Sequence, residues 1–224
     1  MHLSKNRKKQ IEGIDFNKSY SVNDAIKLLK EKKFVKFDES VEVSINTGID
    51  SKQSDQNVRG SFVPPHGLGK KVDIAVFAQG KSAEEAKSLG VKKVGGEDLV
   101  LALQEKIDVD VIIATPDMMS VVSKIAKVLG PKGLMPNPKT GTVTNDVKST
   151  IQNINKGLVA YKNDKAGTIH AALGKISFDD NQLNENINSF IEEIKKIKPS
   201  GVKGNFINSI FISSTMGFGF KVEV

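Results

Sequence analysis

The chain has 224 residues, with 33 Lys and Arg, 26 Asp and Glu, three His and no Cys. Without cysteine, a disulfide, a thiol nucleophile and a zinc knuckle are excluded, and three histidines argue against a transition-metal site, so we expect no metal and no cofactor. The net charge of +7 and an isoelectric point near 9.3 favour a polyanionic partner, although many basic surfaces serve only solubility.

No apolar run approaches the roughly 20 residues that span a bilayer, and the opening MHLSKNRKKQ lacks the apolar stretch of a secretory signal. We therefore expect a cytoplasmic chain with no membrane partner. Residues 1–36 hold ten basic and four acidic residues, which predicts a basic patch near the start. Only Arg7 and Arg59 are arginines, so guanidinium groups that read base edges cannot be the main means of recognition.

The first third of the chain contains helix and strand signals in turn. Ser21, followed by Asp24, predicts the start of an amphipathic helix. FDESVEVSIN alternates polar and apolar residues, which predicts a half-buried strand. Residues 58–63 predict a short strand, and PPHGLGK breaks every regular pattern, so we interpret it as a hinge.

In the middle of the chain, two continuous apolar runs, VDIAVFA and DVDVIIAT, are typical of parallel strands covered on both faces. Ser82 and Glu85 predict a capping box at the start of a helix, and a second helix is expected from Thr115 to Gly130. VKKV predicts a weak strand, and 145–156 predicts a last helix. This order of elements predicts a small α/β sandwich.

The last third returns to antiparallel signals. LVAYK, the turn NDKAG and TIHAALGKISF predict a hairpin, and a long amphipathic helix and two final strands follow. Because both ends of the chain share this style and the middle does not, we expect a fold of class α/β and α+β. A split α+β domain is expected from residues 1–66 and 159–224, with an α/β domain inserted at residues 67–158.

The proline-rich segment LGPKGLMPNPKTGTVT, residues 129–144, contains no acid. It is not a Walker A loop, because Pro138 stands before Lys139 and Thr140 and has no N–H to face a phosphate. Two interpretations stay open. The segment is either a rigid connector or a loop whose prolines hold Lys132 and Lys139 as fixed charges against a nucleic-acid backbone.

Catalytic groups are scarce. The carboxylates that could pair for acid–base chemistry are Asp38, Glu39, Asp179 and Asp180. Their neighbours indicate solvated surface acids, and no histidine has a nucleophile or carboxylate at recognisable spacing, so we expect no enzyme. For His170, contact with RNA and packing against the protein are equal alternatives.

The segment SSTMGFGF near the end is uncharged. Its hydroxyls come from Ser213, Ser214 and Thr215, and its glycines are Gly217 and Gly219. Such a surface can exchange hydrogen bonds with ribose 2′-hydroxyls and phosphate oxygens, while Met216 and Phe37 cover those bonds from water. The alternative is an ordinary bend before a terminal strand.

Six segments together resemble one protein family. They are KFDESVEVSINTGID, VRGSFVPPHGLGK, ATPDMM, LGPKGLMPNPKTGTVT, DKAGTIHAALGKISF and SSTMGFGF, in the family's order and over essentially the whole chain. The chain resembles the L-one family of bacterial large-subunit ribosomal proteins. The resemblance implies a split α+β domain, an inserted Rossmann-like domain that binds no nucleotide, two hinge strands and no catalysis.

The resemblance also implies partners: large-subunit ribosomal RNA in the mobile stalk, deacylated tRNA leaving the exit site, and the chain's own messenger RNA as a target of repression. Carried over by position, the main RNA-binding residues are Lys36, Phe37, Ser40, Ser213, Thr215, Met216, Gly217 and Gly219. A second contact is expected at Lys165, Gly167, His170 and Lys175. The middle domain is expected to contribute Lys132, Gly133, Lys139 and Thr140. The implied location is the cytoplasmic ribosome.

The chain departs from the family pattern after Gly217, where Phe218 and Phe220 replace a proline and a smaller residue. Phe218 either stacks on a base or packs on the sheet. Two other function classes compete. A nucleotide-dependent enzyme would need a phosphate-binding glycine loop after the first strand of the middle domain, where the sequence offers only Gly80. A general polyanion binder held by lysines would lose its affinity steeply with salt.

Overall fold

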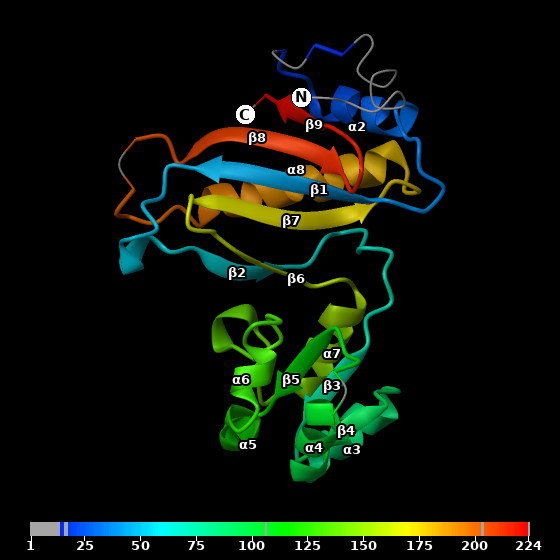
Figure 1. Ribbon diagram of the computed structural model, residues 1–224, viewed down its shortest axis with the longest axis vertical. Coiled ribbons are helices and arrows are strands. Elements are labelled where there is room, and N and C mark those ends of the chain that lie inside the picture. Colours follow the sequence, from blue (N-terminus) through cyan, green and yellow to red (C-terminus); the bar gives the residue numbers. More distant parts are fainter. Residues whose placement is uncertain (1–13, 16–17, 106, 203, 224) are drawn as a thin grey trace. The chain divides into compact units, whose positions relative to one another are not determined.

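The computed structural model describes residues 14–15, 18–105, 107–202 and 204–223. Four of the ten basic residues of the expected N-terminal patch, Lys5, Arg7, Lys8 and Lys9, fall outside the described residues, as does the opening segment MHLSKNRKKQ. The chain divides into two compact units. Unit 1 is drawn from residues 1–58, 64–68 and 161–224, and unit 2 from residues 59–63 and 69–160. Helices and strands are mixed in each, which confirms the expected α/β and α+β class (Figure 1).

Unit 1 is built on a four-stranded sheet in the order β7-β1-β8-β9. Its strands are β1 (Ser40–Thr47), β7 (Thr168–Lys175), β8 (Ile207–Ser214) and β9 (Gly219–Val222). β1 is antiparallel to both of its neighbours, so Ser40 pairs with Lys175 and Val41 pairs with Ser214. The start of β1 therefore lies beside the ends of β7 and β8 (Figure 1).

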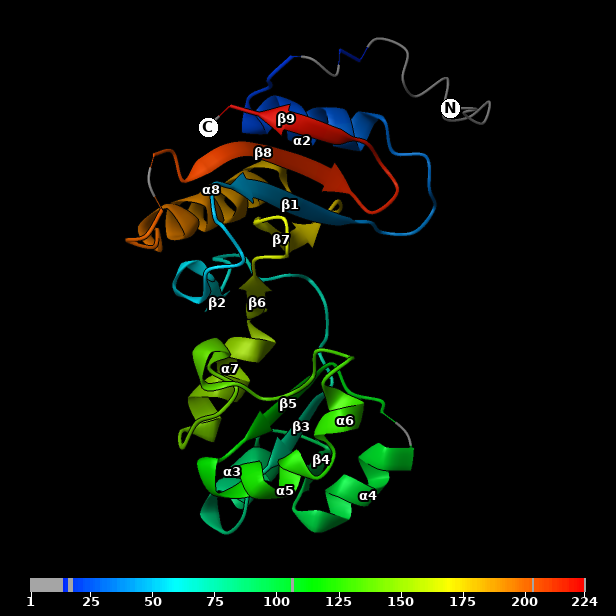
Figure 2. The same ribbon diagram turned by 60° about the vertical axis from the view of Figure 1, so that its left-hand side comes forward.

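One face of this sheet is covered by α2 (Val22–Glu31) and α8 (Asp180–Lys196), which contact each other and the strands (Figure 2). In β1 the residues at 41, 43 and 45 are buried and Glu42 and Asn46 are exposed, which confirms the alternation expected of a half-buried strand. The predicted start of α2 is also confirmed, because the Ser21 hydroxyl accepts a hydrogen bond from the Asp24 amide.

The hairpin expected from residues 158–178 does not form as a ladder. β7 pairs with β1, whereas β6 (Val159–Lys162) pairs with β2 (Arg59–Phe62) in a two-stranded sheet. A single bridge, Asn163 to Ile169, joins the residues on either side of the turn. Sequence alternation predicted the strands correctly, but β7 takes as its partner a strand more than 120 residues away, and α8 packs against it.

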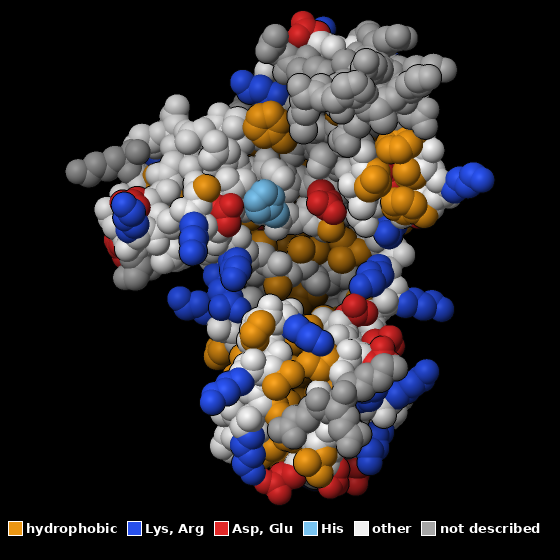
Figure 3. Space-filling model, viewed as in Figure 1, with side chains coloured by type: hydrophobic (Ala, Val, Ile, Leu, Met, Phe, Trp, Pro, Cys, Tyr) orange, Lys and Arg blue, Asp and Glu red, His pale blue; other side chains and the backbone are white. Residues whose placement is uncertain are grey.

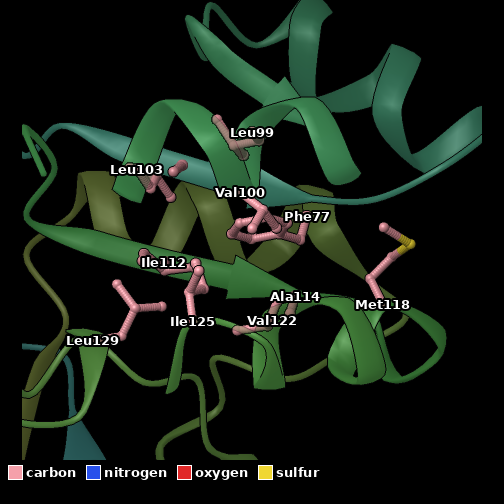
Figure 4. Close-up of a cluster of buried hydrophobic side chains, with 11 residues drawn as sticks. Phe77, Leu99, Val100, Leu103, Ile112, Ala114, Met118, Val122, Ile125 and Leu129 are labelled. Atoms are coloured by element: carbon pink, nitrogen blue, oxygen red, sulfur yellow. The ribbon is translucent and has the colours of Figure 1, made fainter. Parts of the chain in front are cut away.

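Unit 2 contains a parallel sheet in the order β4-β3-β5, formed by β3 (Ile74–Phe77), β4 (Lys93–Gly95) and β5 (Val111–Ala114). Every residue of β3 is buried, as the continuous apolar run predicted. On one face α3 (Lys81–Ser88) and α7 (Val147–Asn155) pack around Val76 and Ile151. On the other, α4 (Glu97–Glu105), α5 (Met119–Ser123) and α6 (Ala126–Leu129) surround Phe77 (Figure 4).

Two helix predictions in unit 2 are corrected. The helix expected from Thr115 to Gly130 is divided into a 3-10 turn, η2 (Pro116–Met118), followed by α5 and α6. At its break the amides of Lys124 and Ile125 bond to carbonyls three residues back, which is 3-10 geometry. The capping box at Ser82 is absent because α3 begins earlier, after Gly80, whose φ of 60° suits glycine in this strand-to-helix turn.

Two further 3-10 turns are η1 (Ser54–Gln56) and η3 (Pro138–Thr140). The part of the chain that the structure describes has no helix long and apolar enough to cross a membrane.

Candidate nucleic-acid interface

Most of the predicted RNA-binding residues assemble at one end of the four-stranded sheet. The strand register places the start of β1 beside the last residue of β7 and the turn after β8, and Ser213 pairs with Gly219 of β9. We call this region the sheet-end surface. Its members are Lys36, Phe37, Ser40, Lys175, Ser213, Thr215, Met216, Gly217 and Gly219.

The sheet-end surface exposes large apolar side chains. Phe37 is 51% exposed and Met216 is 46% exposed, and Lys36 beside them is exposed too. Figure 3 shows hydrophobic side chains gathered at this end of the sheet, with Lys or Arg side chains next to them. Exposed apolar groups that gather in this way are typical of binding surfaces.

Hydrogen bonds within the protein fix the start of β1 to the turn after β8. The Thr215 amide donates to the Ser40 carbonyl at 3.1 Å, and the Ser40 amide donates to the Thr215 hydroxyl at 3.0 Å. The Lys175 ammonium donates to the Ser40 hydroxyl at 2.9 Å. The Thr215 hydroxyl, which we expected to contact RNA, thus accepts a hydrogen bond from the protein's own backbone.

Glu39 corrects one expectation from the sequence. It was expected to be a solvated surface acid, but it is 1% exposed. Its Oε1 atom accepts hydrogen bonds from the Met216 amide at 2.8 Å and from the Ser214 hydroxyl at 3.2 Å. A signal was present in the sequence, because Glu39 stands two residues before Val41 and therefore faces the same side of the strand as the core residues.

Gly217 is closely packed, whereas Gly219 is not. The Gly217 amide donates to the Ser214 hydroxyl at 3.1 Å, and a Cβ atom at position 217 would lie 2.3 Å from that oxygen. A Cβ atom at Gly219 would meet no atom of the described residues within 4 Å. Of these two glycines, only Gly217 is therefore closely approached by atoms of the described residues.

The second predicted contact is divided by the structure. Lys165 and Gly167 lie in the turn before β7, whereas Lys175 is the last residue of that strand. Seven steps along the strand separate Thr168 from Lys175, a distance of about 23 Å. Lys175 therefore lies with the sheet-end surface, and the structure does not bring it together with Lys165.

The turn before β7 is held by Asp164. Its carboxylate accepts hydrogen bonds from the amides of Ala166 at 2.8 Å and Thr168 at 2.7 Å. The bond from the Thr168 amide is the main cause that lowers the pKa of Asp164 below its ordinary value. Gly167 has a φ of 80°, and a Cβ atom there would lie 2.9 Å from the Ile49 carbonyl oxygen, so glycine is required for the turn itself.

His170 projects from the exposed face of β7. Its side chain is 60% exposed, which excludes the interpretation that it packs in the interior. Its Nδ1 atom lies 3.0 Å from the Ser44 hydroxyl of the neighbouring strand, and its Nε2 atom lies 3.8 Å from an oxygen of Asp164. The imidazole is thus held on the open side of the sheet.

In unit 2, the loop of residues 129–144 presents Lys132, Gly133 and Lys139 to solvent. Gly133 has a φ of 72°, a conformation that glycine adopts without strain. Thr140 is different, because it is 5% exposed and its hydroxyl donates to the Asn137 carbonyl at 3.0 Å. The Thr140 side chain is therefore buried within the loop, where its hydroxyl holds the Asn137 carbonyl.

Two residues that the sequence did not single out order this loop. The Asn137 side chain accepts from the Lys139 amide at 2.8 Å, and the Asn137 amide donates to the Thr142 hydroxyl at 2.8 Å. The loop is also anchored to β5, because the Ala114 amide donates to the Thr142 carbonyl at 3.0 Å. Prolines and side-chain hydrogen bonds therefore both restrain the loop.

The two unusual phenylalanines have different environments. Phe220 is 2% exposed and packs edge to face on Tyr20, with ring centroids 5.7 Å apart. Phe218 is half-buried. Phe220 is thus a core residue.

The described residues contain no cluster of three or more His, Asp or Glu that could hold a metal ion. The exposed apolar side chains beside lysine at the sheet end are typical of a binding surface. The model of the Ribosomal protein L1p/L10e family matches residues 29–218, which is more than half of the chain. The chain belongs to this family.

Similar proteins in three bacteria carry the name large ribosomal subunit protein uL1. The protein of Ruthia magnifica subsp. Calyptogena magnifica is 50% identical over 223 residues, 99% of this chain and 96% of that protein. The protein of Thermosipho africanus (strain TCF52B) is 52% identical over 212 residues, 94% and 91% of the two chains. That of Coxiella burnetii (strain Dugway 5J108-111) is 49% identical over 222 residues, 99% and 96%.

These comparisons confirm the resemblance inferred from the six sequence segments. They also agree with the expectation that the chain is not an enzyme, because the relatives are named as ribosomal proteins.

Proposed function

We propose that the chain is a structural constituent of the large ribosomal subunit and binds large-subunit ribosomal RNA through the sheet-end surface. Membership of the family and the names of its relatives support the first part. The second part is supported by one observation above the others. Phe37 and Met216 are half exposed on segments that strand pairing and hydrogen bonds bring together at one end of the sheet.

The chemistry of the sheet-end surface suits folded RNA. Flat or polarizable apolar side chains such as Phe37 and Met216 can cover a base or a ribose, while backbone carbonyls and hydroxyls exchange hydrogen bonds with 2′-hydroxyls. Lys36 and Lys175 add attraction to phosphates without reading a base. Shape and shielded hydrogen bonds therefore supply the discrimination, and lysine supplies the long-range attraction.

Further contacts belong to the same proposal. Lys165, Gly167 and His170 form a second contact in unit 1, and Lys132, Gly133 and Lys139 form the contribution of unit 2. The chain acts in the mobile stalk, assists the release of deacylated tRNA from the exit site, and represses its own messenger RNA. These roles derive from the family resemblance.

The domain arrangement is part of the proposal as well: a Rossmann-like domain of residues 67–158 inserted in a split α+β domain. Its support is the parallel sheet of unit 2 with helices packed on both faces. No observation favours a nucleotide-dependent enzyme, since the turn between β3 and α3 offers Gly80 as its only glycine.

Affinity for a hairpin fragment of large-subunit ribosomal RNA, measured over a range of salt, tests the proposal. We expect Phe37→Ala combined with Met216→Ala to weaken binding by about tenfold or more, because stacking on each base contributes roughly 1–3 kcal/mol. Leu101→Ala is the control, since Leu101 is also an exposed apolar residue, 64% exposed on α4 of unit 2. Equal affinity of the double variant and the wild type would contradict the proposed surface.

The salt dependence separates this proposal from a general polyanion binder. Loss of apolar contacts should leave the slope of log affinity against log salt unchanged, because no phosphate contact is removed. A binder held by lysine alone would show a steep slope and no response to the double variant.

A further inference from the structure

We propose that Glu39 is a positioning residue for RNA binding: its buried carboxylate sets the conformation of the Ser213–Gly217 turn and so the placement of Met216 on the sheet-end surface. The inference rests on the proposed function of that surface. Glu39 is only 1% exposed and cannot contact RNA itself, so it acts through the residues of the turn to which it is hydrogen-bonded.

The Glu39 carboxylate is the centre of a small network. Oε1 accepts from the Met216 amide at 2.8 Å and from the Ser214 hydroxyl at 3.2 Å, and that hydroxyl in turn accepts from the Gly217 amide at 3.1 Å. The partners are up to 177 residues apart in the sequence. One acidic side chain thus holds two polar groups of the turn directly and a third, the Gly217 amide, through the Ser214 hydroxyl.

The direction of the Met216 backbone explains why an acceptor is needed. Its amide points inward to the carboxylate while its side chain is 46% exposed. A buried amide without an acceptor is strongly disfavoured, so removal of the carboxylate would let the turn rotate and move the Met216 side chain. A hydrogen bond to a carboxylate is also shorter and stronger than one to a neutral group.

Stability alone does not account for a carboxylate at this position. The second oxygen, Oε2, is buried and has no hydrogen-bond partner among the described residues. Burial of an acid in this way is costly, and an apolar residue at position 39 would face the same side as Val41 without that cost. We infer that the acid is retained because it orders the turn, which it joins to its own segment between Phe37 and Ser40.

The test uses two variants of the full-length chain and the ribosomal RNA hairpin as the probe. Glu39→Gln keeps an acceptor oxygen for the Met216 amide, and we expect affinity within about threefold of wild type. Glu39→Met has a similar length but no acceptor, and we expect about tenfold weaker binding, an unchanged salt slope and faster hydrogen exchange at the Met216 amide.

A matched control separates positioning from a general loss of stability. Ile187→Val shortens a fully buried apolar side chain of α8 in the same unit and leaves the hydrogen bonds of Glu39 in place. It should lower the thermal midpoint without lowering RNA affinity at a temperature where the protein is folded. If Glu39→Met does not fold, Ser214→Ala takes its place, since it removes the hydroxyl that links Glu39 to the Gly217 amide and leaves that amide only the Ser214 carbonyl, and it should weaken binding by a smaller factor.

The outcomes are distinguishable. Wild-type affinity in Glu39→Met, or in Ser214→Ala where that variant carries the test, would overturn the positioning role and leave the proposed function intact. If Glu39→Gln loses as much affinity as Glu39→Met, a hydrogen-bond acceptor at position 39 is not what RNA binding requires, and the positioning role is overturned as well. Failure of the wild-type chain to bind the RNA would overturn both proposals.

Discussion

The sheet-end surface of unit 1 and the loop of residues 129–144 in unit 2 each present lysine on an ordered backbone, but they are ordered in different ways. At the sheet end the decisive hydrogen bonds join Glu39 to Ser214 and Met216, which are 175 and 177 positions further along the chain. In the loop they join Asn137 to residues two and five positions away. The first surface exists only when the sheet is complete, whereas the second is largely specified by its own short segment.

This difference predicts how each region responds to change. A defect at the sheet end should affect the folding of unit 1, because the same bonds join the start of β1 to the turn after β8. A defect in the loop should remain local, since the loop bonds mainly to itself and to the end of β5. Three perturbations test this difference, and they follow in order of decreasing expected effect.

Substitution of Gly217 should have the largest effect. Gly217→Ala places a methyl group 2.3 Å from the Ser214 hydroxyl oxygen, so either the turn shifts or the hydroxyl rotates away from Glu39 and the residue 217 amide, at a cost of about 1–3 kcal/mol in the free energy of unfolding. Gly219→Ala is the matched control, because its methyl group meets open space and should change that free energy by less than about 0.5 kcal/mol. Urea unfolding measures both, and equal destabilisation of the two variants would show that the turn is not closely packed in solution.

Removal of one hydroxyl should loosen the loop without affecting the sheet end. Thr142→Val removes the acceptor of the Asn137 amide, and we expect a loss of about 1 kcal/mol with faster hydrogen exchange at that amide. Thr142→Ser keeps the hydroxyl and should behave like the wild type. Exchange at the Met216 amide serves as the internal reference, and its acceleration in Thr142→Val would contradict the local character of the loop.

Acid should produce the smallest effect, at the turn before β7. The pKa of Asp164 lies below its ordinary value of 3.8, chiefly because of the hydrogen bond from the Thr168 amide. The ionised carboxylate therefore stabilises the turn above pH 3.8, and this contribution is lost as the pH falls through the lowered pKa. Exchange at the Thr168 amide should accelerate in that acidic range beyond the intrinsic pH dependence, and Asp164→Asn should remove the pH dependence of the turn.

Patterns that act over a few residues were sufficient for much of the fold. The Ser21 cap, the alternation in β1 and the buried runs of β3 and β5 were all predicted, since each depends on neighbouring residues. The break between α5 and α6 was not, because the apolar pattern continues through it and the change to 3-10 bonds leaves no mark in that pattern.

The candidate site was predicted less completely, because it depends on strand register. The family resemblance placed Lys175 in one contact with Lys165, whereas strand register pairs Lys175 with Ser40. Glu39 was taken for a solvated acid from its neighbours, although its spacing from Val41 already indicated the core side of the strand, where it lies 1% exposed. Thr140 was carried over from the family resemblance as an RNA contact, whereas it is the buried last residue of the 3-10 turn η3. The hydrogen bonds that these two residues make depend on partners that the sequence pattern does not identify.

The most direct test of the neutral sheet-end surface is a hydrogen-exchange footprint of the chain with and without the ribosomal RNA hairpin. If shape and shielded hydrogen bonds supply the discrimination, protection should appear in residues 36–40 and 213–217, and it should persist when salt is raised enough to weaken lysine–phosphate contacts. Protection confined to lysine-rich segments elsewhere, with unchanged exchange in these two segments, would contradict the account.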